Sequence, residues 1–157
     1  RRLILGRSGL TAVLVNPPRM RQRLCSELAA EFGSRVTLES TAPETNGVVC
    51  CSWGWWLSHQ HLLPEPEQLI AGMLPIASRE DPLTAARVES LKRQGRDWFR
   101  TLLLPEALAI LIPAIASLRL SGGRLAILDG RVRGRSWGEH VLRALEPWEA
   151  LQRLRPD

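Results

Sequence analysis

The first part of the chain places a short apolar run directly before a helix, and this order restricts the fold more than any other feature. The stretch TAVLV, residues 11–15, has the length and composition of a buried strand. Asn16 and Pro17 follow at once and are typical of the cap and first turn of a helix. The apolar side chains of that helix recur every four residues up to Gly33: Met20, Leu24, Leu28 and Phe32. A strand that leads into an amphipathic helix favours an α/β fold with a parallel sheet.

The rest of the chain continues this alternation. Further strands are predicted at residues 35–40, 46–52, 68–74 and 123–130. Helices are predicted from the cap Asp81 to Gly95, over residues 105–118 with a kink or an end at Pro113, and as a pair over residues 136–154 separated at Pro147. With 157 residues and neither a linker nor an internal repeat, we expect a single domain over residues 1–157.

Composition limits where the protein works. The three cysteines are odd in number and two of them, Cys50 and Cys51, are adjacent, so we expect a reducing, cytoplasmic setting. The apolar runs near the start are broken by glycine and arginine, so neither a secretory signal nor a membrane span is predicted. Because the first residue is arginine instead of methionine, we expect the chain to be part of a longer polypeptide.

Basic residues are unevenly distributed. Of the 21 basic residues only Lys92 is a lysine, and the formal net charge is +5. Residues 1–35 carry seven arginines and residues 119–135 carry five, whereas residues 36–78 carry none. Guanidinium groups suit phosphate and stack on bases, so these blocks favour a face that meets an anion. A general preference for arginine codons would give the same composition, and the two explanations stay open.

Two enzyme motifs are absent or incomplete. The phosphate-binding loop G-x-x-x-x-G-K-[ST] does not occur, because the single lysine has no glycine before it. The stretch GRSWG, residues 134–138, matches the G-x-S-x-G turn of serine hydrolases around Ser136. Residues 129–133 separate this turn from the predicted strand, and the order of later His and Asp residues does not fit a triad. We therefore expect a glycine-rich loop with Ser136 as a helix cap, and an esterase is only the third alternative.

The stretch CCSWGWWLSHQH, residues 50–61, allows three interpretations. Zinc binding would use Cys50, Cys51, His59 and His61, but adjacent cysteines on a strand point to opposite faces. A stacking platform for bases would use Trp53, Trp55 and Trp56. Core packing is expected for at least one of these three rings, since Trp53 and Trp56 would share one face of a helix. We expect no metal.

The last predicted strand ends in ILDGRVRGR, where Asp129 is followed by Arg131, Arg133 and Arg135. Open α/β sheets bind ligands at the carboxyl ends of their strands, so an arginine cluster that faces phosphate is one interpretation. A solvated loop in which Asp129 holds one arginine is the other.

Landmarks over roughly residues 47–135 resemble the C-terminal motor domain of DinG/XPD-type superfamily 2 ATP-dependent DNA helicases. They occur in the order of that family: Leu74-Pro75, Asp81-Pro82, Ala86-Arg87, Pro105-Glu106-Ala107, and Ile127-Leu128-Asp129 with Arg131. The resemblance implies a RecA-like parallel sheet flanked by helices. It also implies an upstream RecA-like domain that binds ATP with Mg through its own phosphate loop, and single-stranded DNA as the partner.

Two motifs of that family are degenerate in this sequence. The family's Q-G-x-G-R-x-I-R motif falls on PAIASLRL, residues 113–120, where neither arginine position is kept and Arg119 lies one residue from the second. Arg119 is therefore our candidate for a displaced arginine finger. The S-F-W-E-G-x-D motif falls on CSWGWWL, residues 51–57, where only Trp53 is retained and the acidic residues are lost.

The resemblance gives two hypotheses. In the first, the chain is the second motor domain of a helicase, inactive alone, with nucleic acid bound by Trp53, Trp55, Trp56, Arg87, Arg131, Arg133 and Arg135. In the second, it is a helicase-derived, catalytically inactive protein that binds nucleic acid or acts as a scaffold. The lost motif arginines favour the second hypothesis.

Overall fold

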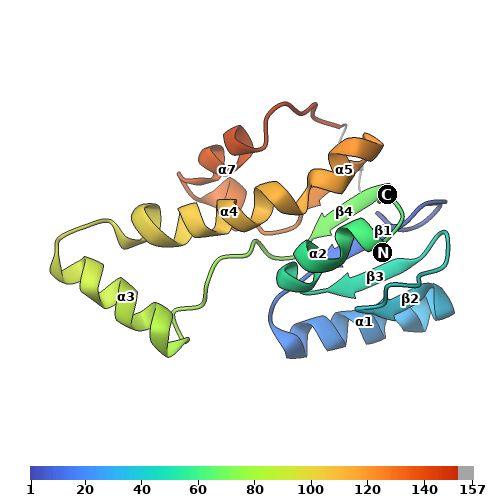
Figure 1. Ribbon diagram of the computed structural model, residues 1–157, viewed down its shortest axis with the longest axis horizontal. Coiled ribbons are helices and arrows are strands. Elements are labelled where there is room, and N and C mark those ends of the chain that lie inside the picture. The colour runs from blue at the N-terminus through green and yellow to red at the C-terminus, as the bar shows by residue number, and fades with distance from the viewer. Residues whose placement is uncertain (152–157) are drawn as a thin grey trace.

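The computed structural model describes residues 1–151 and is built on a five-stranded, wholly parallel sheet (Figure 1). The strands follow the order β2-β3-β1-β4-β5 across the sheet. Their bounds are β1 Thr11–Leu14, β2 Val36–Leu38, β3 Val48–Cys51, β4 Gln68–Ala71 and β5 Arg124–Ile127. Thr11 of the central strand β1 is in register with Val48 of β3 and Gln68 of β4. The α/β class predicted from the sequence is confirmed, and the sheet is consistent with a RecA-like domain.

Helices cover both faces of the sheet. Figure 1 shows α1 (Pro18–Phe32) on one side and α4 (Leu104–Ala114), α5 (Ala116–Ser121) and α7 (Gly138–Ala144) on the other. The remaining helices are α2 (Trp53–His59), α3 (Pro82–Arg93) and α6 (Arg131–Gly134), with 3-10 turns at Gly33–Arg35 and Gln60–Leu62 and a π-helical turn at Phe99–Leu103. The α3 helix projects away from the sheet. None of the helices among the described residues has the length and apolar character needed to cross a membrane.

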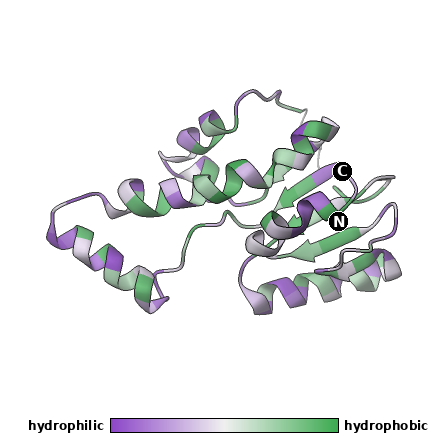
Figure 2. Cartoon of the chain, viewed as in Figure 1, coloured by the Kyte–Doolittle hydropathy of each residue, from purple (hydrophilic) through white to green (hydrophobic). Residues whose placement is uncertain are grey.

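Two apolar clusters fill the space between the sheet and its helices. Neighbouring strand residues alternate between them, as the pleat requires: Ala12 and Leu14 face α4, whereas Val13 faces α1. Cys51 likewise belongs to the first cluster and Cys50 to the second, which confirms that the adjacent thiols diverge. Figure 2 shows the same pattern, with hydrophobic strands inside and hydrophilic residues on the outer surface of α1.

The predicted cap of the first helix is wrong. The helix α1 begins at Pro18 after Pro17, and no side chain caps its first turn. The side-chain oxygen of Asn16 instead accepts a hydrogen bond from the backbone N–H of Trp53 at 2.9 Å. The side-chain oxygen of Asn16 therefore joins the ends of β1 and β3 and does not cap α1. The cap of α3 is as predicted, because Asp81 accepts the N–H of Thr84 at 2.9 Å.

The helices predicted around Pro113 and around Pro147 have different outcomes in the structure. Pro113 ends its helix as expected, since α4 stops at Ala114 and a separate helix α5 starts at Ala116. The closing helical pair is not formed as predicted. Within residues 136–151 the second helix of the pair is not formed: residues 147–151 are irregular, and the indole N–H of Trp148 donates to the carbonyl of Leu142 at 2.8 Å. The end of the predicted pair, residues 152–154, lies outside the described residues.

Candidate nucleic-acid interface

The tryptophans at residues 53–56 lie on the short helix α2, directly after β3. Ser52 caps this helix, since its hydroxyl accepts the N–H of Trp55 at 3.1 Å. Trp53 and Trp56 are one turn apart and share the inner face of the helix, where they are 1% and 0% exposed. The indole N–H of Trp53 donates to the carbonyl of Met73 at 2.9 Å, so both the ring and its polar atom are satisfied inside the protein.

This placement corrects the predicted stacking platform. Trp53 and Trp56 offer no ring face to a base, because apolar residues of the core surround them. Trp55 is half-buried, and its outer partner is His59, whose ring stacks on it with centroids 4.3 Å apart and planes 11° apart. The expectation of core packing for at least one of the three rings is confirmed.

Side chains of α2 and of the turn after it donate hydrogen bonds to backbone carbonyls where Pro113 separates α4 from α5. The indole N–H of Trp56 donates to the carbonyl of Ala114 at 2.7 Å. The side chain of Gln60 donates to the carbonyl of Pro113 at 2.9 Å and accepts the hydroxyl of Ser117 at 3.0 Å. Gln60 is only 2% exposed, so this network replaces water at carbonyls that the helix break leaves unpaired. Trp56, from the segment 51–57, and residues of the segment 113–120 therefore meet in a neutral, buried network.

Arg119 is held by the end of α7. Its guanidinium donates to the carbonyls of Leu145 at 2.5 Å and Pro147 at 3.1 Å. A cation at the C-terminal end of a helix is favoured by the helix dipole, which explains the contact. The role of Arg119 as an arginine finger stays a prediction, and it would require these bonds to break.

The four residues considered for zinc do not share one site. Cys50 and Cys51 lie on opposite faces of β3, and His59 is stacked on Trp55. Burial raises the pKa of the Cys50 thiol to about 12 and raises that of Cys51 as well, so both thiols are protonated at neutral pH. Among residues 1–151, no three His, Cys, Asp or Glu side chains come together as metal ligands.

A second aromatic cluster lies elsewhere and is accompanied by arginines. A cleft of about 470 Å³ separates the residues before α4 from those after β5. We name it the arginine–tryptophan cleft, and its lining residues are Asp97, Trp98, Phe99, Arg100, Arg131, Arg135, Ser136 and Trp137. The two halves come from distant parts of the sequence, and Phe99 joins them by packing on Trp137 with ring centroids 5.0 Å apart.

Trp98 is the centre of the basic surface at this cleft. The guanidinium carbon of Arg79 lies 4.4 Å from the centre of its ring, and the ammonium of Lys92 lies 5.8 Å from it. Both distances are within the range of cation–π attraction. Trp98 itself is half-buried, whereas Arg100 and Arg135 on the other side of the cleft are exposed. Two cations therefore lie against the ring of Trp98, and two more, Arg100 and Arg135, line the cleft beside it.

Hydrogen bonds hold two arginines of the cleft, Arg100 and Arg131. Arg100 donates to the hydroxyl of Ser136 at 3.0 Å and joins the segment before α4 to the loop before α7. Arg131 makes two hydrogen bonds to the carboxylate of Asp129, at 2.9 and 2.5 Å. Asp129 also accepts the backbone N–H of Leu74 at 3.2 Å, which anchors the cleft to the ends of β4 and β5. The hydrogen bond from Arg131 holds the pKa of Asp129 below its usual range, and the same bond raises the pKa of Arg131.

The structure brings together only some of the residues predicted to bind nucleic acid. Arg131 and Arg135 both line the cleft. Arg133 lines a different groove beside β5. Arg87 lies on α3, where it pairs with Glu106 at 2.5 Å, and Trp55 lies on α2. Asp129 holds one arginine, Arg131, as the second interpretation expects. That the arginines after β5 face phosphate stays a prediction.

Sequence reasoning missed the other half of the cleft. Trp98 and Arg100 belong to the stretch GRDWFR, residues 95–100, which interleaves basic and aromatic side chains after the end of α3. That interleaving was the available signal. Ser136 was predicted to cap a helix, but α7 starts at Gly138 without a side-chain cap and Ser136 accepts the bond from Arg100 instead. A guanidinium stays protonated and cannot act as the base that an esterase serine needs.

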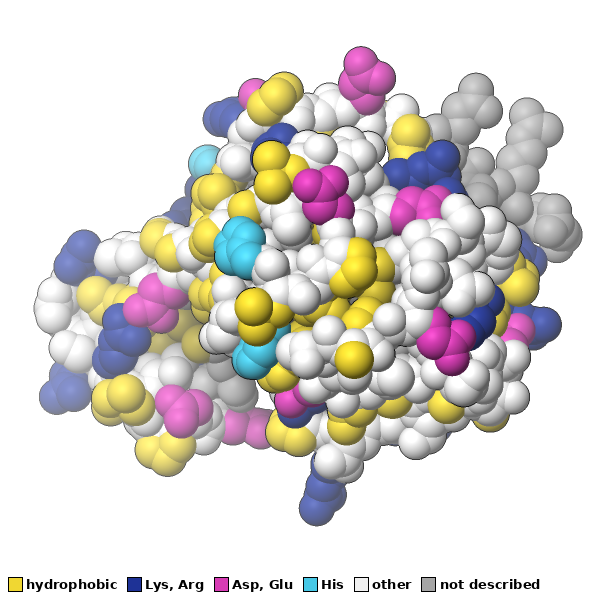
Figure 3. All heavy atoms as spheres, turned by 45° about the vertical axis from the view of Figure 1, so that its right-hand side comes forward, with side chains coloured by type: hydrophobic (Ala, Val, Ile, Leu, Met, Phe, Trp, Pro, Cys, Tyr) yellow, Lys and Arg dark blue, Asp and Glu magenta, His cyan; other side chains and the backbone are white. Residues whose placement is uncertain are grey.

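Charge on the remaining surface is more mixed. On the face shown in Figure 3, the basic side chains lie mainly towards the margins, and hydrophobic and histidine side chains gather in the middle. That face therefore presents no single basic field to an anion.

Comparisons with known proteins point to one group. The chain is 28% identical over 130 residues to the ATP-dependent DNA helicase YoaA of Haemophilus influenzae, which covers 81% of the chain and 20% of the relative. It is 36% identical over 75 residues to the 3'-5' exonuclease DinG of Bacillus subtilis, which covers 46% of the chain and 8% of the relative. The chain thus spans about a fifth of the length of the first relative and less than a tenth of the second. A scan against protein-family models finds no match. The two similarities relate the chain to YoaA- and DinG-type proteins and support a helicase-related function.

Proposed function

We propose that this chain is the second RecA-like motor domain of a DinG/YoaA-type DNA helicase and that it binds single-stranded DNA at the arginine–tryptophan cleft. The observation that carries the proposal is the convergence of Trp98 and Arg100 with Arg131 and Arg135 on one cleft. The parallel sheet and the similarity to the helicase YoaA support the domain assignment. In this proposal, residues 1–157 form one domain that works in the cytoplasm with an upstream RecA-like domain.

The composition of the cleft suits a single strand better than a duplex. A single strand offers unstacked base faces together with phosphates, and aromatic rings and guanidinium groups match these two in turn. Three cations line the cleft, Arg100, Arg131 and Arg135, and two more, Arg79 and Lys92, lie against the ring of Trp98. Of the acidic groups nearby, Asp129 is neutralised by Arg131, and Asp97 lies 3.8 Å from Arg100. The surface that remains is basic.

In this proposal the chain does not hold the phosphates of ATP by itself. It has no phosphate-binding loop, and Arg119 at the degenerate motif donates its hydrogen bonds to backbone carbonyls. In the proposal, ATP and Mg are held by the upstream domain, and this chain contributes the nucleic-acid contacts and one wall of the interdomain site.

A specific observation favours a second candidate, a helicase-derived domain that binds nucleic acid without turning over ATP. Trp56, Gln60 and Ser117 fill the place where the two motifs meet with neutral hydrogen bonds. Charged motif residues that couple ATP to movement would not fit such a buried network without paired charges. The coding sequence upstream of Arg1 separates the candidates, because an intact G-K-[ST] and D-E-x-H there would favour the motor.

The experiment for both candidates is a titration of the 157-residue chain with a fluorescent single-stranded oligonucleotide. Anisotropy is followed at roughly 50 and 200 mM salt, because phosphate contacts release counterions and weaken steeply with salt. We expect binding that the double change Arg100→Glu and Arg135→Glu abolishes. The matched control is Arg19→Glu, an exposed position on α1. Equal loss of affinity in the control, or no binding at the lower salt, would contradict the proposed site.

A further inference from the structure

The outer edge of β5 has no strand paired to it among the described residues. Within residues 1–151, β5 is the last strand of the sheet and pairs with β4 alone. The N–H groups of Arg124 and Leu128 point to β4, where they donate to the carbonyls of Glu67 at 3.0 Å and Ala71 at 2.9 Å. Because the direction of backbone groups alternates along a strand, the N–H and C=O groups of Leu125 and Ile127 point to the outer edge. Such an edge is a template for another strand.

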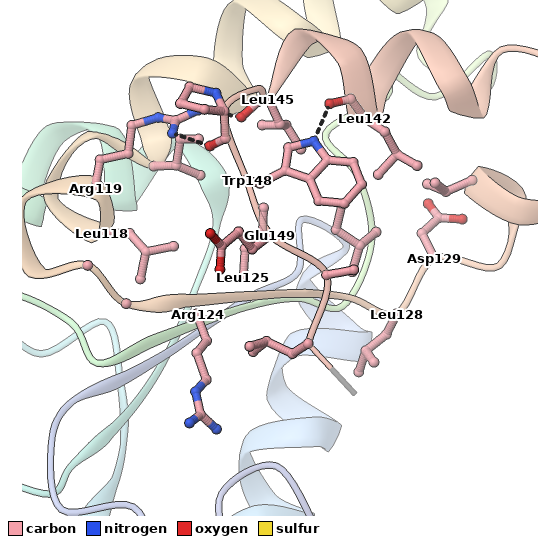
Figure 4. Close-up of a pocket in the computed structure, with 18 of the residues that line it drawn as sticks. Leu118, Arg119, Arg124, Leu125, Leu128, Asp129, Leu142, Leu145, Trp148 and Glu149 are labelled. Carbon is pink, nitrogen blue, oxygen red and sulfur yellow. Dashed lines mark hydrogen bonds between the residues drawn. The ribbon is translucent and has the colours of Figure 1, made fainter. Parts of the chain in front are cut away.

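A groove of about 1020 Å³ runs beside this edge. Figure 4 shows it between β5, the end of α5 and the segment that follows α7. Its floor is apolar and comprises Leu118, Leu125, Ile127, Leu142, Leu145 and Trp148. Trp148 is 49% exposed and Leu128, at the end of the strand, is 59% exposed, so apolar surface reaches the solvent here.

The charged residues of the groove are mostly basic. Arg124 and Arg133 line it and are exposed. Figure 4 shows Arg119 next to Leu118, and Arg124 extending from β5 on the side away from Trp148 and Glu149. Of the acidic residues that line it within residues 1–151, Asp129 is paired with Arg131, and Glu149 is the other. The groove therefore complements a ligand that is both apolar and acidic.

We propose that this groove binds an extended, acidic segment of a partner protein, which adds a strand to the outer edge of β5. Strand addition uses the outward N–H and C=O groups of Leu125 and Ile127 for affinity, and alternate side chains of the segment enter the apolar floor. Acidic residues at the intervening positions meet Arg124 and Arg133. A polypeptide fits better than a nucleic acid, because a row of alternating backbone donors and acceptors beside leucine side chains matches a second backbone and its apolar side chains.

The first test uses a short fluorescein-labelled peptide that alternates valine or leucine with glutamate, and the intact 157-residue chain. We expect saturable anisotropy for this peptide and none for the same peptide with lysine in place of each glutamate. The double change Arg124→Glu and Arg133→Glu should weaken binding about tenfold or more, since two charges that line the groove become repulsive. The control Arg19→Glu, on the other side of the sheet, should bind as the unchanged chain does. Equal binding of both peptides, or equal loss in the control, would overturn the proposal.

The second test reports on the backbone edge itself. Hydrogen exchange at the amides of Leu125 and Ile127 should be fast in the free chain and slow when the acidic peptide is added, whereas the amide of Ala126 should be slow in both. A peptide methylated at alternate backbone nitrogens should bind weakly only when the methylated face meets β5. Slow exchange at Leu125 and Ile127 in the free chain would show that the chain covers its own edge. Protection by a single-stranded oligonucleotide in place of the peptide would show that the groove belongs to nucleic acid. Either result would reject the proposed partner.

Discussion

Two aromatic regions of this molecule differ in burial: one is part of the core and the other lies at the surface. The cluster at residues 53–56 has the higher density of tryptophan in the sequence, and two of its rings are almost fully buried. The region around Trp98 has one tryptophan in GRDWFR, and it forms one wall of an open basic cleft. The neighbours decide the difference. Trp53 and Trp56 share a helix face that packs on apolar residues, whereas Trp98 follows Asp97, has Arg96 and Arg100 two positions away on either side, and carries Arg79 against its ring.

The comparison teaches that density of aromatic residues indicates a core at least as often as a binding surface. Charges interleaved with the rings are the better sign of a surface that stacks on a ligand, because a charged neighbour resists burial.

Removal of Trp56 should damage the fold. We expect Trp56→Ala to lower the free energy of unfolding by about 3–5 kcal/mol, because a large buried ring is lost and leaves a cavity. The carbonyl of Ala114 also loses its donor. Urea denaturation followed by circular dichroism measures the change, with Trp55→Ala, at a half-buried position, as the control. If Trp56→Ala does not fold, Trp56→Phe tests the lost N–H alone. Losses of equal size at Trp55 and Trp56 would mean that Trp56 is not a core residue.

Removal of Trp98 should instead affect binding. We expect Trp98→Ala to weaken the affinity for a single-stranded oligonucleotide by about 1–3 kcal/mol, the usual contribution of a stacked base. Its free energy of unfolding should change less than that of Trp56→Ala. Anisotropy measures the affinity, and Trp55→Ala is again the comparison. If the affinity falls with Trp55→Ala and not with Trp98→Ala, the α2 cluster is the platform and the cleft is not.

Much of the fold follows from local patterns. The run TAVLV before an amphipathic helix predicted β1 and α1, and Pro113 predicted the break between α4 and α5. The spacing of Trp53 and Trp56 already put them on one helix face, which is the face that the core covers. These features depend on residues close together in the sequence, so the sequence alone contains them.

The candidate site could be predicted only in part, because it depends on distant contacts. Arg131 and Arg135 were predicted from their place after β5, where parallel sheets bind ligands. Trp98 and Arg100 reach the same cleft from a segment before α4, and no local pattern indicates that pairing. Asn16 shows the same limit on a smaller scale, since its cap role gave way to a bond with Trp53.

A substitution of Gln60 measures how much the buried hydrogen-bond network contributes to the free energy of unfolding. Gln60→Leu keeps the volume but leaves the carbonyl of Pro113 and the hydroxyl of Ser117 without their partner. We expect the free energy of unfolding to fall by about 1–3 kcal/mol. The matched control is Gln22→Leu on the exposed surface of α1, which should change it little. A loss no larger than that of the control would mean that water replaces the glutamine and that the network is not sealed.

The smallest effect is expected at the pair of Asp129 and Arg131, which joins the cleft to the sheet. The pKa of Asp129 is lower in the folded chain than in the unfolded chain, chiefly because of the hydrogen bond from Arg131. The pair therefore stabilises the fold at pH values above the ordinary pKa of aspartate, and this stabilisation is lost as the pH falls through the lower, folded pKa. The side chain of Arg131 is 40% exposed, so we expect a contribution of under about 1 kcal/mol. Urea midpoints measured from neutral pH down into the acid range should decline less steeply for Asp129→Asn and for Arg131→Gln than for the unchanged chain. If Arg131→Gln keeps the full decline, the bond from the Leu74 amide, and not the arginine, holds this carboxylate, and Arg131 is free to bind phosphate in the cleft.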